Sequence, residues 1–158
     1  MKKQFLLNLL LTFVWVSLTG IFLFINFFFG FVLGYFILWT LNRNTDEGGY
    51  FKRLPKVINF LFFFLYELLL ANLEVAYDLI TPRYYMKPGV IKFELKARTD
   101  LEITLLSNLI SLTPGTMVLD VSDDKKVLYI HAMYIKNREQ FIKRIQEGFE
   151  RRLLDILR

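Results

Sequence analysis

Three carboxylates in a largely apolar stretch are the first candidates for a functional role. Glu67, Glu74 and Asp78 lie in a predicted helix from Pro55 to about Ile80. At 100° per residue they fall within one sector of roughly 100°, while Phe and Leu fill most of the rest. Carboxylates at membrane depth are costly and often functional, so Glu67 is a candidate for a cation or proton path. The alternatives are an ion pair with a neighbouring subunit, or access to water together with Glu74 and Asp78.

A second candidate is the hydroxyl-bearing turn Ser111-Leu112-Thr113-Pro114-Gly115-Thr116. Catalysis by a hydroxyl would need a base nearby, and the sequence offers none. The stretch is therefore interpreted as a helix stop, with hydroxyls bonded to the backbone. His131 is predicted to lie on a strand and to be a hydrogen-bonded structural residue.

The residues that are missing exclude whole classes of function. The chain has no Cys and one His, which excludes disulfides, thiol nucleophiles, zinc–thiolate sites and multi-histidine metal sites. No catalytic, cofactor-binding or metal-binding residue is predicted, and the chain is not expected to be an enzyme. Residues 83–158 carry 14 basic and 10 acidic residues, a net charge of +4. No nucleic-acid-binding pattern accompanies this charge, so a location beside anionic lipid is the simpler interpretation.

The predicted secondary structure begins with a long uncharged run. Phe5 to Leu41 is 37 residues without a charge. As one helix it would be ~55 Å long, against a bilayer core of about 30 Å, so two short helices with a reversal between Gly20 and Asn26 fit better. The run is too long for a cleaved signal peptide and is interpreted as an anchor.

The second predicted helix contains Gly30-Phe31-Val32-Leu33-Gly34, a spacing that lets two helix backbones approach closely in lipid. Gly30 and Gly34 are therefore candidate helix-packing residues. The alternative is that glycine is simply common in membrane helices.

The number of membrane spans depends on the third helix. Residues 42–53 are predicted to be a polar loop, with Pro55 in the first turn of the helix that follows. Basic residues flank every apolar segment except the reversal near residues 20–26. Two spans plus an amphipathic third helix at the membrane boundary keep all basic clusters in the cytoplasm, and this arrangement is favoured. Three spans stay open, because Val57 to Leu73 is apolar enough to cross.

The remainder predicts a small α+β domain of β-α-β-β-α order. Val90 to Ala97 alternates like a half-buried strand, and Thr99 with Glu102 forms a capping box for a helix to about Leu112. Two strands around Ser122–Lys125 suggest a hairpin, and Asn137 caps a final helix. The predicted fold is a helical membrane region over residues 1–82, made of a short hairpin and an amphipathic helix, followed by a cytoplasmic α+β domain over residues 83–158.

Several of these segments together resemble the E subunit of the Mrp/Mnh-type multisubunit cation/proton antiporters. They are Tyr66-Glu67-Leu68, Ala71-Asn72-Leu73, Ala76 to Arg83, Lys87-Pro88-Gly89, Asp100 to Thr116, Val127 to Met133 and Gly148 to Arg152. The turn Thr113-Pro114-Gly115-Thr116, with Asn108-Leu109-Ile110 upstream, is the most specific part. The resemblance covers essentially the whole chain.

The resemblance implies an accessory subunit of a sodium/proton antiporter in a bacterial or archaeal plasma membrane. Its partners would be the other antiporter subunits and the lipid bilayer, with no nucleic acid, and the complex would support pH and salt tolerance. No catalytic residue carries over from the family. Two alternatives stay open: a direct contribution of Glu67 to an ion path, and an independent membrane-tethered regulatory domain.

Overall fold

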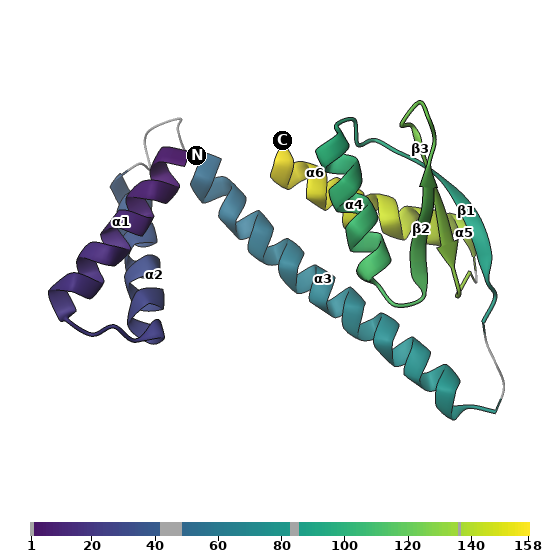
Figure 1. The fold of residues 1–158 in the computed structure, drawn as a ribbon, viewed down its shortest axis with the longest axis horizontal. Coiled ribbons are helices and arrows are strands. Elements are labelled where there is room, and N and C mark those ends of the chain that lie inside the picture. Colours follow the sequence, from purple (N-terminus) through teal and green to yellow (C-terminus); the bar gives the residue numbers. More distant parts are fainter. Residues whose placement is uncertain (1, 42–48, 83–85, 136) are drawn as a thin grey trace. The chain divides into compact units, whose positions relative to one another are not determined.

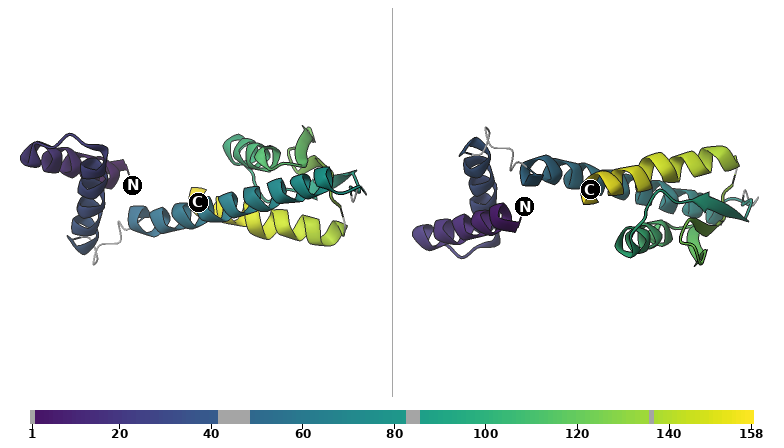
Figure 2. Two further views of the ribbon diagram at one scale, coloured as in Figure 1. Left: turned by 90° about the horizontal axis from the view of Figure 1, so that it is seen from below. Right: turned by 90° about the horizontal axis from the view of Figure 1, so that it is seen from above.

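The computed structural model describes residues 2–41, 49–82, 86–135 and 137–158. The chain divides into two compact units, Met1–Pro55 and Lys56–Arg158. Their elements are labelled in Figure 1, and two further views are given in Figure 2.

The first unit is built on a hairpin of two helices, α1 (Lys2–Thr19) and α2 (Phe24–Leu41). Gly20 has φ +66°, a backbone conformation that favours glycine because glycine has no Cβ. The Asn26 amide ties the reversal together: Nδ2 donates to Thr19 Oγ1 at 2.7 Å and to Ile21 O at 2.8 Å, while Oδ1 accepts from Trp15 Nε1 at 2.9 Å. The predicted pair of helices with a reversal between Gly20 and Asn26 is confirmed.

The third helix, α3, begins earlier than its sequence indicates. It runs from Gly49 to Ile80, so the prediction of a loop up to residue 53 is wrong from Gly49 onward, and residues 42–48 lie outside the described residues. Pro55 lies inside the helix rather than in its first turn. Proline removes one helical hydrogen bond and crowds the carbonyl four residues earlier, that of Phe51. Packing offsets this cost, because the buried Phe51 side chain packs with Leu38 of α2.

Two described helical segments are long and apolar enough to cross a membrane, Phe24–Leu41 and Phe51–Ile80. The apolar part of α1, Lys3–Thr19, is shorter. Length and composition therefore select α2 and the stretch Phe51–Ile80, and they do not decide between the two-span and the three-span arrangement.

The second unit contains a small α+β fold after α3. Its elements follow in the order β1 (Gly89–Glu94), α4 (Asp100–Leu112), β2 (Thr116–Val121), β3 (Val127–Ala132), α5 (Arg138–Lys143), η1 (Arg144–Glu150) and α6 (Arg151–Leu157). The strands form an antiparallel sheet of order β1-β3-β2, with a bulge between Val118 and Asp120. The predicted β-α-β-β-α order is confirmed. The last helix is continuous from α5 to α6 through the π-helical turn η1, and these three elements are called the C-terminal helix below.

One face of the sheet carries the core. Phe93 and Leu128 point inward and pack with Leu106 of α4 and Phe149 of η1. Lys92, which alternates with the buried positions of β1, is exposed on the other face. The alternation predicted for β1 is therefore confirmed, with the helices covering a single face of the sheet.

Local capping sets the ends of the helices. Thr99 and Glu102 form the predicted capping box at the start of α4, and the Asn137 side chain accepts hydrogen bonds from the Glu139 and Gln140 amides at the start of α5. β1 ends at Glu94, three residues before its predicted end. The amides of Lys96 and Ala97 donate instead to Glu150 Oε1, which draws this part of the chain out of the sheet.

Candidate functional site

The polar face of α3 is covered by the C-terminal helix of the same unit. Phe63 and Phe64 of α3 contact Phe149, with ring centroids 5.4 and 6.5 Å apart. Beside these rings, Glu67 is 8% exposed and Asp78 is 5% exposed. Two of the carboxylates that the helical period places on one face are therefore buried within the chain itself, and Glu74 between them is half-buried. The row Glu67–Glu74–Asp78 is called the acidic row below.

Glu67 is paired with an arginine of its own chain. Arg144 Nε donates to Glu67 Oε2 at 2.7 Å, and an Nη nitrogen of the same guanidinium contacts that oxygen. The Glu67 side chain is 10% exposed and that of Arg144 is 46% exposed, so the pair lies at the edge of the interface. A charge-assisted contact of this kind fixes the orientation of both side chains. The sequence allowed an ion pair between Glu67 and a neighbouring subunit. In the structure the basic partner is Arg144 of η1, in the same chain.

Further contacts hold the same two helices together. The Arg152 guanidinium lies 4.4 Å from the centre of the Phe63 ring, and its Nη1 donates to Asn59 Oδ1 at 2.8 Å. A Cβ added to Gly148 would lie 2.8 Å from Phe63 Cζ, so glycine is needed for this close approach. Polar, stacking and steric contacts therefore bind α3 to the C-terminal helix over several turns.

Glu74 and Asp78, the C-terminal members of the acidic row, lie near Tyr134. Burial raises the pKa of Tyr134 to about 12, assisted by a hydrogen bond with the Asp78 carboxylate and by the negative charges of Asp78 and Glu74. Glu74 lines a cavity of about 50 Å³ together with Tyr134 and Arg144. A volume of this size holds a few water molecules at most.

The turn singled out by sequence borders the same cavity. Thr113 Oγ1 donates to Leu109 O at 3.1 Å, and Thr116 Oγ1 donates to Ile110 O at 2.6 Å. Gly115 has φ +81°, and a Cβ there would lie 3.3 Å from the Tyr134 ring. Pro114 also lines the cavity. The hydroxyls bond the backbone, as the helix-stop interpretation expects, and the turn meets the acidic row, which the sequence did not reveal.

Gly30 and Gly34 lie in the first unit, in contact with α1. A Cβ at Gly30 would lie 2.9 Å from Trp15 Cδ1, and one at Gly34 would lie 2.4 Å from Asn8 Oδ1. Both glycines are buried. The GxxxG spacing thus faces α1 within the same chain, where it allows close approach of the two backbones.

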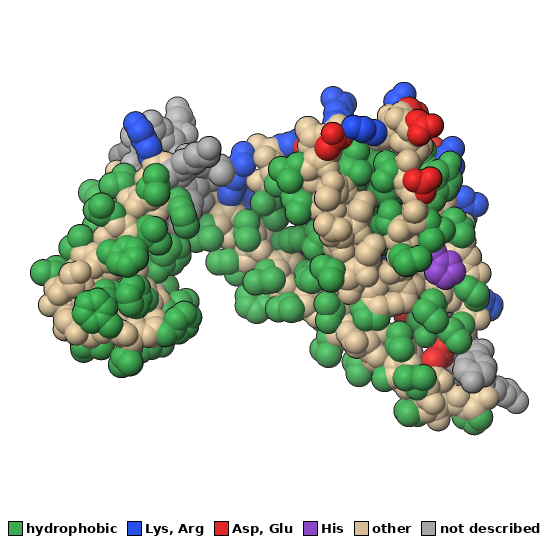
Figure 3. Space-filling view, viewed as in Figure 1, with side chains coloured by type: hydrophobic (Ala, Val, Ile, Leu, Met, Phe, Trp, Pro, Cys, Tyr) green, Lys and Arg blue, Asp and Glu red, His purple; other side chains and the backbone are tan. Residues whose placement is uncertain are grey.

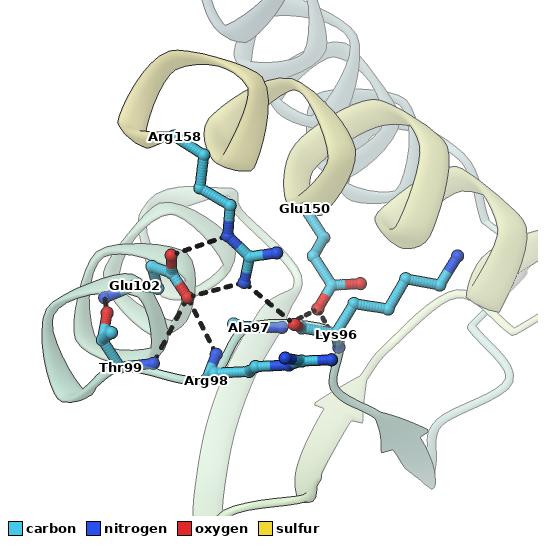
Figure 4. Close-up of polar contacts among 7 residues, drawn as sticks. All are labelled: Lys96, Ala97, Arg98, Thr99, Glu102, Glu150 and Arg158. Atoms are coloured by element: carbon cyan, nitrogen blue, oxygen red, sulfur yellow. Dashed lines mark hydrogen bonds and ion pairs between the residues drawn. The ribbon is translucent and has the colours of Figure 1, made fainter.

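A second polar cluster joins α4 to the end of the C-terminal helix (Figure 4). Glu102 accepts from Arg158 at 3.1 Å and from the amides of Arg98 and Thr99. The Arg158 hydrogen bond, followed by the Arg98 amide, lowers the pKa of Glu102 to about 2. Sequence reasoning found Glu102 as a cap but missed Arg158 and Glu150, because both lie more than forty residues along the chain from their partners.

The last candidate from the sequence is His131. His131 is part-buried in the middle strand, between Val90 of β1 and Met117 of β2. Among the residues that the structure describes, no three His, Cys, Asp or Glu side chains are grouped so that they could hold a metal ion.

Comparison with known proteins identifies relatives over the full chain. A family model described as "Na+/H+ ion antiporter subunit" matches residues 8–156. The chain is 39% identical over 156 residues to the Na(+)/H(+) antiporter E subunit of Alkalihalophilus pseudofirmus, covering 99% of both chains. It is also 39% identical over 158 residues to the Na(+)/H(+) antiporter E subunit of Bacillus subtilis, covering 100% of both.

Two solved structures are similar to this chain. A chain of the Mrp complex from Dietzia sp. is 27% identical, with a TM-score of 0.50, over 65% of this chain and 96% of that one. A chain of the membrane-bound sulfane sulfur reductase, an archaeal respiratory membrane complex, shares the fold with a TM-score of 0.57 at 24% identity over 99% of both chains. On the full-length family match and these identities, the chain belongs to the family of Na+/H+ antiporter E subunits.

Proposed function

We propose that this protein is an accessory subunit of a multisubunit Na+/H+ antiporter in the plasma membrane, where it supports assembly and stability of the complex. The relatives are named as antiporter subunits, and a structural neighbour comes from an Mrp complex. Transport rather than catalysis is the activity of the assembly, and the other antiporter subunits are the proposed partners.

The observation that carries the accessory role is the ion pair between Glu67 and Arg144. A carboxylate that relays ions must exchange partners during transport, whereas Glu67 is held by a guanidinium of its own chain. The remaining members of the acidic row face Tyr134 and a cavity with room for only a few waters. This supports a structural role for the row over conduction.

The test is Glu67→Gln in the assembled complex, with Na+/H+ exchange measured in membrane vesicles and normalised to the amount of complex. We expect less complex, because the ion pair is weakened, with unchanged exchange per complex. Glu94→Gln, on an exposed position of β1, is the matched control. Normal assembly with exchange lost would refute the accessory role and establish Glu67 as part of an ion path.

The proposed topology is two spans, formed by α1 and α2, with α3 at the membrane surface and the α+β domain in the cytoplasm. The contacts of α3 with the C-terminal helix support it: a helix whose polar face is covered by a charged domain over several turns is not surrounded by lipid. The sequence assigned residues 56–82 to the membrane region. In this proposal they lie against lipid on one side only, because the C-terminal helix covers the other side.

Single cysteines at Lys2 and Ser122 test this topology, because the native chain contains no Cys. A membrane-impermeant thiol reagent is applied to intact cells and to opened ones. Protection of both positions in intact cells, with labelling after opening, is the expected result. Labelling of Lys2 alone in intact cells would refute two spans, since it would place the two positions on opposite sides.

A further inference from the structure

The face of α3 opposite the acidic row is apolar and exposed. It is formed by the side chains of Ile58, Leu61, Phe62, Leu65, Leu69 and Leu73, which are between 46% and 68% exposed. Figure 3 shows hydrophobic side chains gathered along this helix. Such a face, on a helix whose other side is polar, is typical of a helix lying in the headgroup region of a bilayer.

One edge of this apolar face borders the C-terminal helix. By helical geometry, Tyr66 and Tyr77 lie within about 20° of Asn59 around the axis of α3. Asn59 accepts a hydrogen bond from Arg152, which fixes this edge beside α6. The two tyrosines are 60% and 54% exposed. Exposed tyrosines beside an apolar surface suit the boundary between hydrocarbon and water.

The border between α3 and the C-terminal helix carries basic residues and two cavities. The two open cavities, of about 570 and 380 Å³, are each lined by one residue of α3, Lys56 and Phe63 respectively, and by residues of the C-terminal helix. The charged side chains that line the first are Lys56, Lys96, Arg151 and Arg158, with Glu147 and Asp155, and those that line the second are Lys143, Arg144 and Arg152, with Glu147. Cations outnumber carboxylates in both cavities, so the border attracts anions.

Two of the cations on the C-terminal helix are available to a ligand. Arg144, Arg152 and Arg158 are already bonded to Glu67, Asn59 and Glu102. Lys143 and Arg151 are exposed, and within the described residues neither makes an ion pair or a side-chain hydrogen bond. They lie eight residues apart, about 12 Å along the C-terminal helix, and each lines one of the two cavities.

We propose that this border binds anionic phospholipids. Phosphate oxygens accept hydrogen bonds from Lys143 and Arg151 at the two cavities, and the acyl chains lie against the apolar face of α3. The border joins the two things that such a lipid needs, donors for its headgroup and an adjoining apolar surface for its chains. The inference rests on the proposed position of α3 at the membrane surface.

The test compares lipids that differ only in headgroup charge. The full chain is reconstituted in phosphatidylcholine bilayers containing traces of spin-labelled phosphatidylglycerol or spin-labelled phosphatidylcholine, and the protein-associated fraction of each is measured. We expect a preference for phosphatidylglycerol that weakens as salt is raised. Each cation near the surface contributes roughly fivefold, so the preference should fall at least about fivefold in Lys143→Gln/Arg151→Gln.

The matched control is Lys92→Gln/Lys126→Gln, which removes the same charge from the exposed face and the turn of the sheet. We expect this variant to keep the native preference. An equal fall in both variants would show that only the net charge matters and would overturn the site. Displacement of the labelled lipid by soluble glycerol phosphate at low concentration would also overturn it, because the acyl chains would then contribute nothing.

Failure of this inference is distinct from failure of the proposed function. Co-purification of the native chain with the antiporter subunits, combined with no lipid preference, would overturn the lipid site and assign the apolar face to a protein partner. A lipid preference in a chain that does not co-purify with those subunits would refute the proposed function alone.

Discussion

The two described segments that satisfy the length and hydropathy of a membrane span, α2 and the stretch Phe51–Ile80, are held in different ways. α2 contacts its neighbour α1 through two glycines, where the absence of side chains allows close packing. α3 contacts the C-terminal helix through the Glu67 carboxylate, two arginines and edge-to-face phenylalanine rings. Both segments have a mean hydropathy high enough for a membrane span, so hydropathy does not distinguish them. What distinguishes them is the chemistry of the face that is covered.

The difference predicts a separation in pH and salt dependence. Steric packing of glycine against a helix involves no titratable group, so the stability of the hairpin should depend little on either variable. The α3 contacts include an ion pair, which is screened by salt. Variants in the two regions therefore test whether α2 and α3 are held by different interactions.

The largest effect is expected for Gly34→Leu. Its Cβ alone would lie 2.4 Å from Asn8 Oδ1, so α1 and α2 must move apart, and overpacking of this kind typically costs ~1–3 kcal/mol or more. The measurement is the thermal midpoint of the chain in detergent at two pH values, with the exposed Phe36→Leu as control. A native midpoint for Gly34→Leu would show that the hairpin is not held by this contact.

A smaller effect is expected from the ion pair of α3. Arg144→Gln and Glu67→Gln should each destabilise the second unit by ~1–3 kcal/mol, the range for hydrogen bonds to charged groups, with the low end favoured because Arg144 is half exposed. The double variant should cost less than the sum of the two, and high salt should reduce the coupling. Additive losses would mean that the two side chains act independently.

The acid stability of the second unit should depend on Glu102. Its folded pKa of about 2 lies below the ordinary 4.5, so its stabilising effect is complete above pH 4.5 and is lost as pH falls toward 2. Glu102→Gln should flatten the fall in unfolding free energy over that window. The measurement is chemical denaturation across that pH range. Asp123→Asn, in the exposed β2–β3 turn, should retain the native slope.

The smallest expected effect lies at alkaline pH. The folded pKa of Tyr134 is raised to about 12, so the stabilisation from its neutral form is present below pH 10 and is lost as pH rises toward 12. Tyr134→Phe should remove this alkaline loss at a modest cost in stability at neutral pH. Tyr129→Phe, on an exposed position of β3, provides the comparison. Retention of the alkaline loss in Tyr134→Phe would assign it to another group.

Local patterns in the sequence were enough for most elements of the fold. Period-2 alternation predicted β1, the Thr99–Glu102 spacing predicted the start of α4, and the uncharged run from Phe5 to Leu41 predicted a hairpin. The error at the start of α3 came from giving Pro55 its usual local meaning. The burial of Phe51 against Leu38 outweighs that preference, and it involves residues that are not adjacent in the chain.

The helical hairpin, the α+β order, the placement of Glu67, Glu74 and Asp78 on one helical face, and the resemblance to the antiporter E subunits could all be predicted from the sequence. These features depend on residue types at short spacings, where backbone geometry relates one position to the next. The residues that cover that face are evident only in the folded chain: Arg144 on Glu67, and Tyr134 beside Asp78. These partners lie more than fifty residues apart along the chain, so packing of the whole unit, rather than local periodicity, brings their charges together.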